Sequence, residues 1–396
     1  MTCLLSVENM LIGYPARFEV FGAVKIYELS KIHTLFSIGV EGKPGAFNIS
    51  SFRELENIMS STVFVVPVKN EDPASLEGVL RAIPHDSPVI VVSNSQKFPL
   101  NIYKLEQDIA KMLYKTTGRT IIVVHQKDQV IADRLREALP LIIDEKQRVR
   151  DGKGEGMLIG VLLADALRAE NVAFVDADNY IPSVVLEYAL IFYTALSASE
   201  SKYKMVRIYW SHKAWFAEQL YLRRTGRAST LVNSVFNKIL SFRQRKETDI
   251  IKTSNSGEHA MSIELARELI YGGGFSAETQ ELVGILEKCY LNIDRGLCKI
   301  LPENIEIYQV ESISPHIHAE KGESHISEMV IESLSAIYNS ELPDERGKRQ
   351  ILDTLRDLGF VGEPLITNKY DYPEINVKNL LDTVVTESNE SLALGI

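Results

Sequence analysis

The stretch that decides the fold runs from residue 171 to residue 179 and reads Asn-Val-Ala-Phe-Val-Asp-Ala-Asp-Asn. Its apolar first part predicts a buried strand over 172–176 that leads into two aspartates spaced i and i+2. Open α/β sheets bind ligands beyond the carboxyl ends of their strands, and both carboxylates of an extended Asp-x-Asp reach the same side. Asp176 and Asp178 are therefore a candidate site for Mg²⁺ or Mn²⁺ bridging a diphosphate. The alternative is that they only end the strand and cap the helix starting near Pro182.

Size and composition are typical of a large globular protein. The chain has 396 residues, of which 45% are hydrophobic and 24% are charged, in the ordinary range for folded domains. The formal net charge of -10 argues against non-specific nucleic-acid binding, which needs a surplus of Lys and Arg facing phosphates. The longest apolar segment, 184–198, is interrupted by Glu187 and is shorter than the roughly 20 residues of a membrane span. We therefore expect neither a nucleic-acid nor a membrane partner.

The cysteines and the N-terminus indicate the compartment. Cys3, Cys289 and Cys298 form no Cys-x-x-Cys pair, and so sparse and odd a count predicts no disulfide framework and suits a reducing compartment. The N-terminus carries Glu8 within its apolar stretch and lacks a basic lead, unlike a secretory signal. We expect a cytoplasmic protein.

Short β-branched runs alternate with amphipathic stretches through the first half, a pattern typical of βαβ units and a mainly parallel sheet. The predicted strands are 62–68, 88–93, 120–125, 172–176, 204–210 and 304–311. The predicted helices are 102–114, 130–139, 156–168, 230–241, one from Ser262, 278–289, 322–338 and a charged helix to Leu358, with a loop at 253–259. We expect strand 204–210 beside the two aspartates, and an acidic tail that wraps the surface or frays.

The predicted strands of the first half end in polar residues, so several loops meet at one edge of the sheet. These loops carry Pro67, Lys69, Asn70 and Glu71 after the first strand, Ser93 and Asn94 after the second, and Gln126 after the third. Their amide, hydroxyl and carboxylate groups suit the edges of a base and a ribose. The alternative is that each is an ordinary turn, since turns favour Asn, Asp and Ser.

The run Arg-Asp-Gly-Lys-Gly-Glu-Gly at 150–156 opens a predicted helix. Its glycines let the backbone approach a phosphate, the helix N-terminus offers unpaired N–H donors, and Lys153 supplies a positive charge. A plain flexible loop is the alternative. Basic residues also gather between Lys202 and Lys252, Arg207 among them. Such a cluster suits a phosphorylated small molecule, although a solvated basic face is the other explanation.

Two histidines and one polar loop complete the candidate chemistry. His316 and His318 follow a strand, and a single imidazole joining two carboxylates suits Mn²⁺ or Zn²⁺. The polar loop 253–259, which ends in Glu258 and His259, is dense enough to hold a substrate. Alternatively it caps the helix from Ser262.

Taken in order, these segments resemble the mannosyl-3-phosphoglycerate synthase family, retaining glycosyltransferases with the GT-A nucleotide-sugar-binding fold. The resemblance covers roughly residues 20–340 and rests on Phe21-Gly22-Ala23-Val24, Val66-Pro67-Val68-Lys69-Asn70-Glu71, Ile83-Pro84-His85, Ser93-Asn94-Ser95, His125-Gln126-Lys127-Asp128, Gly152-Lys153-Gly154-Glu155-Gly156-Met157, Asp176-Ala177-Asp178-Asn179-Tyr180, Met205-Val206-Arg207, Gly257-Glu258-His259-Ala260-Met261, and Pro315-His316-Ile317-His318 with Lys321-Gly322.

The resemblance implies an α/β fold with a mainly parallel, Rossmann-like sheet flanked by helices. We expect a segment 1–54 packing on the core and a catalytic domain over 55–322, with its nucleotide half at about 55–180 and its acceptor half at about 181–322. Residues 323–396 are expected to form a helical C-terminal extension and tail. A homodimer is expected.

The implied reaction is transfer of α-mannose from GDP-mannose to the 2-hydroxyl of D-3-phosphoglycerate with retention, giving mannosyl-3-phosphoglycerate, precursor of the compatible solute mannosylglycerate. Retention suggests attack from the leaving-group face, with the GDP phosphate taking the acceptor proton. The implied cofactor is a divalent metal, Mg²⁺ or Mn²⁺, with Zn²⁺ or Co²⁺ as alternatives, held by Asp178 and His318 with Asp176 nearby.

The resemblance also implies roles for individual residues. Catalytic roles are expected of Asp176, Lys153 and Glu258. The donor is expected to contact Pro67, Lys69, Asn70, Glu71, Ser93, Asn94, Gln126, Lys153, Asp176 and Ala177, and the acceptor Arg207, Asn255, Gly257, Glu258 and His259.

The chain departs from the family pattern at three places. It has Asp151 where the family usually has Ser, Ser256 where it has Ala, and Ala319-Glu320 where it has an acidic pair. A carboxylate at Asp151 weakens attraction for a phosphate, so acceptor preference stays open. The alternatives are another retaining transferase, such as a glucosyl-3-phosphoglycerate synthase, and a non-catalytic nucleotide-sugar-binding protein. A nucleotidyltransferase would need a glycine-rich basic loop at 67–71, and an Asp-x-Asp phosphatase would need Thr or Val in place of Tyr180.

Overall fold

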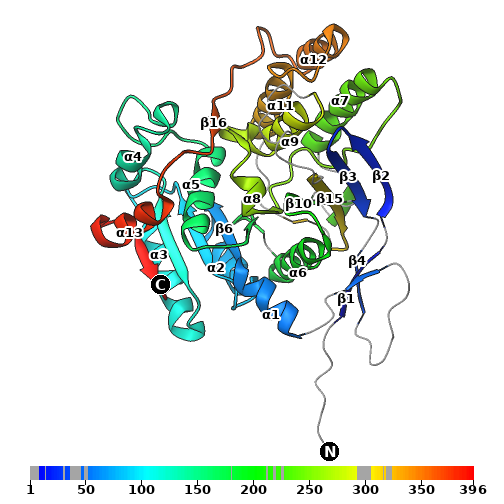
Figure 1. Ribbon diagram of the computed structural model, residues 1–396. Coiled ribbons are helices and arrows are strands. Elements are labelled where there is room, and N and C mark those ends of the chain that lie inside the picture. Colours follow the sequence, from blue (N-terminus) through cyan, green and yellow to red (C-terminus); the bar gives the residue numbers. More distant parts are fainter. Residues whose placement is uncertain are drawn as a thin grey trace, which may run out of the picture.

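A ten-stranded sheet forms the centre of the protein in the computed structural model (Figure 1), which describes residues 9–13, 15–29, 32–35, 46–48, 52–179, 181–210, 213–216, 220–223, 227–291, 305–314, 316–317 and 323–396. The strand order is β17-β8-β7-β6-β9-β13-β10-β15-β3-β2. The bounds are β2 (Pro15–Phe21), β3 (Val24–Leu29), β6 (Thr62–Val68), β7 (Val89–Ser93), β8 (Ile121–His125), β9 (Asn171–Phe174), β10 (Lys204–Trp210), β13 (His259–Ser262), β15 (Ile305–Ser312) and β17 (Leu392–Leu394).

The part of the sheet formed by residues 62–174 is parallel and deeply buried. β8, β7, β6 and β9 run side by side in the same direction and are buried along nearly their whole length. Apart from Pro67 and the polar residues Thr62, Ser93, His125 and Asn171 at strand ends, they consist of Val, Ile, Phe and Ala, without the alternation of a half-exposed strand. Such runs are typical of parallel strands covered by helices on both faces. Their carboxyl ends consequently share one edge.

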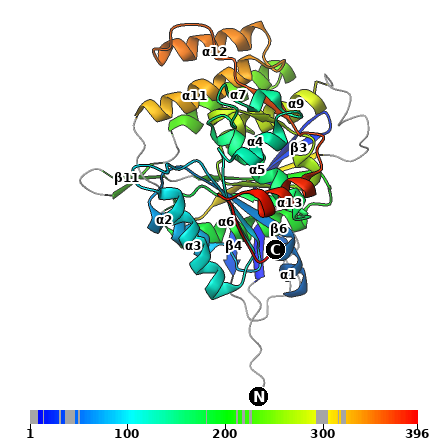
Figure 2. The same ribbon diagram turned by 90° about the vertical axis from the view of Figure 1, so that its left-hand side faces the viewer.

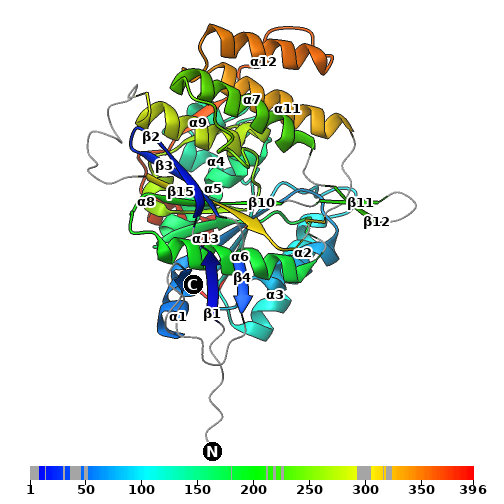
Figure 3. The ribbon, with the colours of Figure 1, turned by 90° about the vertical axis from the view of Figure 1, so that its right-hand side faces the viewer.

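Helices cover both faces of this sheet (Figures 2 and 3). On one face lie α1 (Phe52–Ser61), α2 (Pro73–Ala82), α3 (Ile102–Thr117) and α6 (Pro182–Ala198). On the other lie α4 (Gln129–Leu135), α5 (Lys153–Ala166), α8 (Ile263–Ala266), α9 (Ala277–Cys289) and α13 (Val377–Glu387). Beyond α9, α7 (Arg227–Gln244), α11 (Glu323–Tyr338) and α12 (Glu345–Asp357) pack together. The predicted α/β class with a mostly parallel sheet and C-terminal helices is confirmed.

The remaining strands form three small sheets. β1 (Asn9–Gly13) pairs with β4 (Ile32–Leu35) and with β5 (Ala46–Asn48), and β11 (Lys213–Phe216) forms a hairpin with β12 (Leu220–Arg223). β14 (Ile270–Gly272) pairs with β16 (Lys369–Asp371), so the C-terminal extension reaches back to a segment about 100 residues earlier in the chain.

One central strand differs from the prediction. β13 lies between β9 and β10 and runs antiparallel to both, whereas the sequence predicted a loop to residue 259 and a helix from Ser262. The strand is only four residues long and Ser262 does cap the short helix α8, its hydroxyl accepting from Leu265 N at 3.4 Å. The helix therefore begins one residue after the predicted start, its cap is Ser262 and not the 253–259 loop, and the strand before it was missed. As a result β10 lies one strand further from the two aspartates than predicted.

Both ends of the chain contribute strands to the sheet. β3 pairs in parallel with β15 and antiparallel with β2, so residues 15–29 extend the sheet beyond β15. At the other end β17 pairs antiparallel with β8, where a surface or fraying tail was predicted. Tyr103 and Gln107 both donate to the carbonyl of Glu390, at 2.7 and 2.6 Å. These bonds and the pairing explain why the acidic tail has a fixed place.

The structure also bears on the expectations about disulfides and membrane-spanning helices. Cys289, the last residue of α9, is disulfide-bonded, whereas the sparse cysteine count predicted no disulfide framework. In the part of the chain that the structure describes, none of the helices combines the length and the apolar character needed to cross a membrane.

Candidate active site

The polar ends of β6, β7 and β8 lie side by side at the carboxyl edge of the sheet. Val68 is in register with Ser93, and Ser93 with His125. The loops are joined by hydrogen bonds: Asn70 N donates to Ser95 Oγ at 2.7 Å, and Asn70 Oδ1 accepts from Gln96 N at 2.8 Å. Among the predicted donor-side residues, Lys69 and Asn70 are exposed, Pro67, Glu71 and Asn94 are half-buried, and Ser93 and Gln126 are buried. The structure thus brings these residues to one edge.

The glycine-rich run 150–156 is attached to the same edge. Gln126, which follows β8, donates through Nε2 to the carbonyls of Arg150 at 2.6 Å and Gly152 at 3.1 Å. Helix α5 then begins at Lys153 rather than at the predicted 156. The N-terminal N–H groups of a helix favour anions, and here they open toward the loops of β6 to β8.

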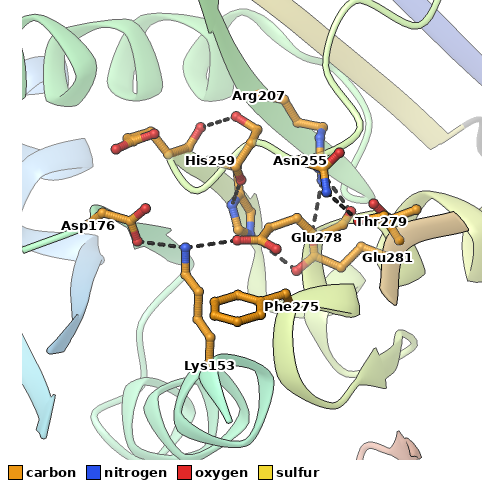
Figure 4. A network of polar contacts seen from close by, with 12 residues as sticks. Lys153, Asp176, Arg207, Asn255, His259, Phe275, Glu278, Thr279 and Glu281 are labelled. Atoms are coloured by element: carbon orange, nitrogen blue, oxygen red, sulfur yellow. Dashed lines mark hydrogen bonds and ion pairs between the residues drawn. The ribbon is translucent and has the colours of Figure 1, made fainter. Parts of the chain in front are cut away.

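Lys153 lies between two carboxylates (Figure 4). Its Nζ is 2.7 Å from Asp176 Oδ1 and 2.8 Å from Glu278 Oε1. Burial disfavours a charge here, but the charges and hydrogen bonds of Asp176 and Glu278 outweigh it and raise the pKa of Lys153 well above its usual range. Lys153 is therefore positively charged at neutral pH and joins the end of β9 to the first turn of α9.

Another carboxyl group, that of Glu258, lies near Asp176 and Asp178. It is buried, and Asn179 Nδ2 donates to Glu258 Oε1 at 3.2 Å and to the carbonyl of Asp176 at 2.8 Å. Burial first, and then the charges of Asp176 and Asp178, raise the pKa of Glu258 well above its usual range, against the opposing charge of Lys153. Asp178 and Ala177 are buried as well. Negative charge is thus concentrated where β9 ends.

Gly257 packs directly against this pair of charges. A Cβ at this position would overlap Asp176 Oδ2 and lie 3.0 Å from Lys153 Nζ. We expect Gly257→Ala to push the Asp176 side chain away from Lys153 and to lower kcat at least about tenfold, because a small displacement of a catalytic group is costly. The overlapping atom is the end of a side chain, so the melting temperature should change little. Steady-state kinetics and a thermal melt of the same preparation check this; unchanged kcat would contradict it.

The Arg207 side chain is buried inside the protein, whereas the sequence predicted that it would contact the acceptor. Its side chain is 0% exposed, and all five guanidinium N–H groups face protein atoms. The charged partner is Glu281 Oε2 at 2.9 Å, and the others are the carbonyls of Thr253, Ser254 and Glu278 and the sulfur of Met205. In this arrangement Arg207 holds the 253–259 loop to α9 from behind, which corrects the expectation of direct contact with an acceptor.

His259 and Asn255 are enclosed in the same way. His259 has one ring nitrogen 2.8 Å from the Ser256 carbonyl and the other 3.1 Å from Glu281 Oε1, and its ring stacks on Phe174. Asn255 Nδ2 donates to Ser333 Oγ at 2.5 Å. Of the predicted acceptor-side residues, only Gly257 and Glu258 have contacts or charge interactions with Asp176 that the structure describes.

Two departures from the family pattern have clear partners. Asp151 Oδ1 accepts from Asn94 Nδ2 at 2.9 Å and lies 3.3 Å from Lys127 Nζ. Although partial burial opposes it, these contacts lower the pKa of Asp151 below its usual range. The carboxylate is therefore engaged with Lys127 rather than with Lys153. Ser256 is buried, with its hydroxyl 2.7 Å from the carbonyls of both Ile208 and Glu258.

The two predicted histidines have separate outcomes. His316 is buried, its ring stacks on Trp210 with 4.2 Å between centroids, and its Nδ1 is 3.4 Å from the Tyr188 hydroxyl. It is therefore a packed residue. His318, the predicted metal ligand, lies outside the described residues. Among the residues that are described, no three His, Cys, Asp or Glu side chains are grouped so as to hold a metal ion.

Glu278 and Glu281 are the residues of this site that the sequence did not reveal. They lie three apart at the start of α9, so both face the same way, toward Lys153 and toward Arg207 with His259 (Figure 4). Burial opposes the charge on Glu281, yet His259 and Arg207 lower its pKa. Glu278 lies in the first turn of α9, where acidic residues are common because they suit the helix dipole, and no local pattern marks either glutamate as buried.

Comparisons with known proteins agree with the resemblance. The sequence model described as mannosyl-3-phosphoglycerate synthase matches residues 14–383. The mannosyl-3-phosphoglycerate synthase of Aeropyrum pernix is 43% identical over 393 residues, covering 98% of this chain and 100% of that protein. That of Pyrococcus furiosus is 38% identical over 397 residues, with coverages of 98% and 100%.

Solved structures that resemble the chain include glucosyl-3-phosphoglycerate synthase of Mycobacterium tuberculosis. Its complex with Mn²⁺, UDP-glucose and glycerol 3-phosphate has a TM-score of 0.47 and 19% identity, covering 77% of this chain and 88% of that one. Its complex with phosphoglyceric acid has a TM-score of 0.46 and 19% identity, with coverages of 74% and 84%.

The family match spans most of the chain, and two relatives well above 30% identity match it over nearly their full lengths. This chain belongs to the mannosyl-3-phosphoglycerate synthase family of glycosyltransferases.

Proposed function

We propose that the chain transfers mannose from GDP-mannose to the 2-hydroxyl of D-3-phosphoglycerate with retention of configuration. The observation that carries the proposal is the meeting of Asp176, Asp178 and Lys153 at the carboxyl end of β9. Nucleotide ligands bind at this edge of α/β sheets. The loops of β6 to β8 supply amide and hydroxyl groups for the nucleoside at the same edge, and the names of the relatives supply the identity of the product.

A divalent cation fits the donor set. Asp176 and Asp178 offer carboxylate oxygens, which Mg²⁺ and Mn²⁺ prefer, and the raised pKa of Glu258 reflects, after burial, the negative charge of both. A cation would offset that charge. We propose that Asp178 and His318 hold it with Asp176 nearby. When bound, it supplies a positive charge that stabilises the departing diphosphate.

Lys153 is the protein group best suited to contact that diphosphate. It is charged, one-fifth exposed, and located at the N-terminus of α5, where backbone N–H donors also favour anions. In the transfer, the bond between mannose C1 and the GDP oxygen breaks and a bond between C1 and the acceptor hydroxyl oxygen forms. The acceptor hydroxyl attacks C1 directly from the face of the leaving group, so the step needs no protein nucleophile, and its proton passes to the departing phosphate.

The acceptor is proposed to bind beside Gly257 and Glu258. Glu258 is buried against the aspartates, and we propose that it contacts a hydroxyl of the reacting groups when they are bound. Arg207 and His259 act from behind the loop through Glu281, so their role in the proposal is to fix the loop that carries Glu258.

The proposal predicts cation-dependent formation of one product. Purified protein with GDP-mannose, D-3-phosphoglycerate and Mg²⁺ or Mn²⁺ should release GDP and a mannosyl phosphoglycerate of the expected mass, with α configuration by NMR. Excess EDTA should abolish turnover, and added cation should restore it. The reason is that Lys153 pairs with Asp176, and we propose that the cation balances the negative charge of Asp178. Full turnover in EDTA would refute the cation assignment, and a product of β configuration would refute retention.

A further inference from the structure

The C-terminal extension contacts two glycine-containing segments, 150–156, which includes Lys153, and 272–274. Its strand β16 pairs with β14, with Tyr370 in register with Tyr271 and Lys369 with Gly272. Gly273 N donates to the carbonyl of Asn368 at 2.9 Å. This pairing buries the Tyr370 side chain, and its hydroxyl donates to Glu155 Oε1 at 2.8 Å.

Glu155 is a buried carboxylate in the same first turn of α5 as Lys153. Its Oε2 accepts from Gly274 N at 3.1 Å. A Cβ added at Gly152 would overlap Glu155 Oε2, and one at Gly273 would lie 2.7 Å from Glu155 Oε1. The carboxylate is therefore enclosed between the 150–156 run and the 272–274 segment, and both need glycine where they meet it.

These contacts form a closed path around Lys153. The 272–274 segment leads into the first turn of α9, where Glu278 is paired with Lys153 at 2.8 Å. From Lys153 the path runs through the first turn of α5 to Glu155, across to Gly274, along the chain to Glu278, and back to Lys153. Glu155 thus links the starts of α5 and α9.

Tyr370 in turn fixes Glu155. Burial, followed by the charge of Glu155, raises the pKa of Tyr370 well above its usual range, so the hydroxyl stays a donor at all physiological pH values. A hydrogen bond to a buried carboxylate is of the stronger kind, and its loss leaves part of the desolvation of that carboxylate uncompensated.

We propose that Tyr370 and Glu155 are positioning residues for the reaction: the C-terminal extension, through the Tyr370 to Glu155 hydrogen bond, holds Lys153 in the place where it meets the diphosphate of the donor. The role given to Lys153 rests on the proposed function. The contacts that form the path do not.

The chain offers a matched control in Tyr372. Its hydroxyl donates to Asp165 Oδ2, and Asp165 also pairs with Arg267 at 2.6 Å. Tyr372 therefore makes the same kind of bond, from the same extension to the same helix. Asp165 lies 12 residues along α5 from Lys153, however, or about 18 Å at the rise of an α-helix. Tyr370→Phe and Tyr372→Phe each remove one hydroxyl and keep the ring.

The test compares kcat and KM of both variants in the wild-type and Lys153→Ala backgrounds. We expect Tyr370→Phe to lower kcat about tenfold, the lower end for loss of a group supporting a catalytic residue, with KM for 3-phosphoglycerate within about twofold of wild type. Tyr372→Phe should keep kcat within about twofold. In the Lys153→Ala background Tyr370→Phe should cause no further loss, because residues acting through one another are not additive.

Three results would overturn the proposal: kcat within twofold of wild type for Tyr370→Phe, an equal loss for Tyr372→Phe, or a tenfold loss that persists without Lys153. Hydrogen exchange gives a readout that needs no substrate. Peptides covering 150–157 and 271–279 should exchange faster in Tyr370→Phe and not in Tyr372→Phe, and equal exchange in both variants counts against the path. If the wild-type protein makes no product, the proposed function fails, and the exchange result still decides whether Tyr370 orders these segments.

Discussion

Replacing Asp178 with alanine is expected to lower kcat at least about 100-fold, the scale of one preorganised electrostatic group in catalysis, and to leave the protein folded. Asp178 is buried beside two other carboxylates, Asp176 and Glu258. Removing the Asp178 carboxylate lessens the electrostatic crowding around the buried Glu258 carboxyl group, which offsets the loss of the contacts of Asp178. GDP release measures kcat, and a thermal melt of the same sample measures stability.

Asp165 provides the control for this prediction. It is a buried aspartate on α5 whose charge is balanced by Arg267 and by the Tyr372 hydroxyl. Asp165→Ala should therefore lower the melting temperature while leaving kcat near that of the wild type. The alternative that the aspartates cap the helix after Pro182 is not supported, since the N-cap of α6 is Ile181 and no side chain of the described residues caps it. If Asp178→Ala unfolds the protein instead, Asp178 is a structural residue and the catalytic interpretation of Asp-x-Asp is wrong.

Replacing Arg207 with methionine is expected to lower the free energy of unfolding by about 3–5 kcal/mol, the cost of removing one partner from a buried ion pair. Its guanidinium is enclosed between Glu281 and the carbonyls of Thr253, Ser254 and Glu278. Methionine fills similar volume but leaves the buried Glu281 carboxylate with the His259 ring, 3.1 Å away, as its remaining partner in this pair of contacts. Urea denaturation followed by circular dichroism measures the change.

The exposed pair of Arg356 and Asp353 shows what an ordinary ion pair contributes in the same protein. Both side chains are about two-thirds exposed, so Arg356→Met should cost less than about 1 kcal/mol. A difference of less than 1 kcal/mol between the two variants would show that Arg207 is not a structural residue. In that case the contact with an acceptor, which the sequence predicted, would have to be considered again.

The sequence predicted best those strands that are buried on both faces, because their own residues are mostly apolar. β6 and β10 have the predicted bounds, and β7 and β8 differ by one residue, because each is rich in β-branched and other apolar residues. β13 was missed because four residues that begin with His and end with Ser show no such run. The pairing of β17 with β8 and of β16 with β14 depends on where the chain returns, which no local pattern records.

The same distinction holds for the site. Asp176 and Lys153 were found because they follow a buried strand and open a glycine-rich helix, features that lie close together in the sequence. The partners that fix them come from distant segments: Glu281 is 74 residues from Arg207, and Tyr370 is 215 residues from Glu155. The local sequence around Arg207 predicts a strand but does not show which distant helix will pack against it. For that reason Arg207 was predicted to bind a ligand, and its pairing with Glu281 was not foreseen.

The most direct test of the central claim is a competition assay. The protein would be given equal concentrations of GDP-mannose, GDP-glucose and UDP-glucose, with D-3-phosphoglycerate and glycerate together as acceptors, and every product would be identified by mass spectrometry and NMR. The account predicts α-mannosyl-3-phosphoglycerate with GDP as the main products, and little transfer to glycerate. Preferred transfer of glucose, equal use of glycerate, or nucleotide-sugar binding without any transfer would contradict it.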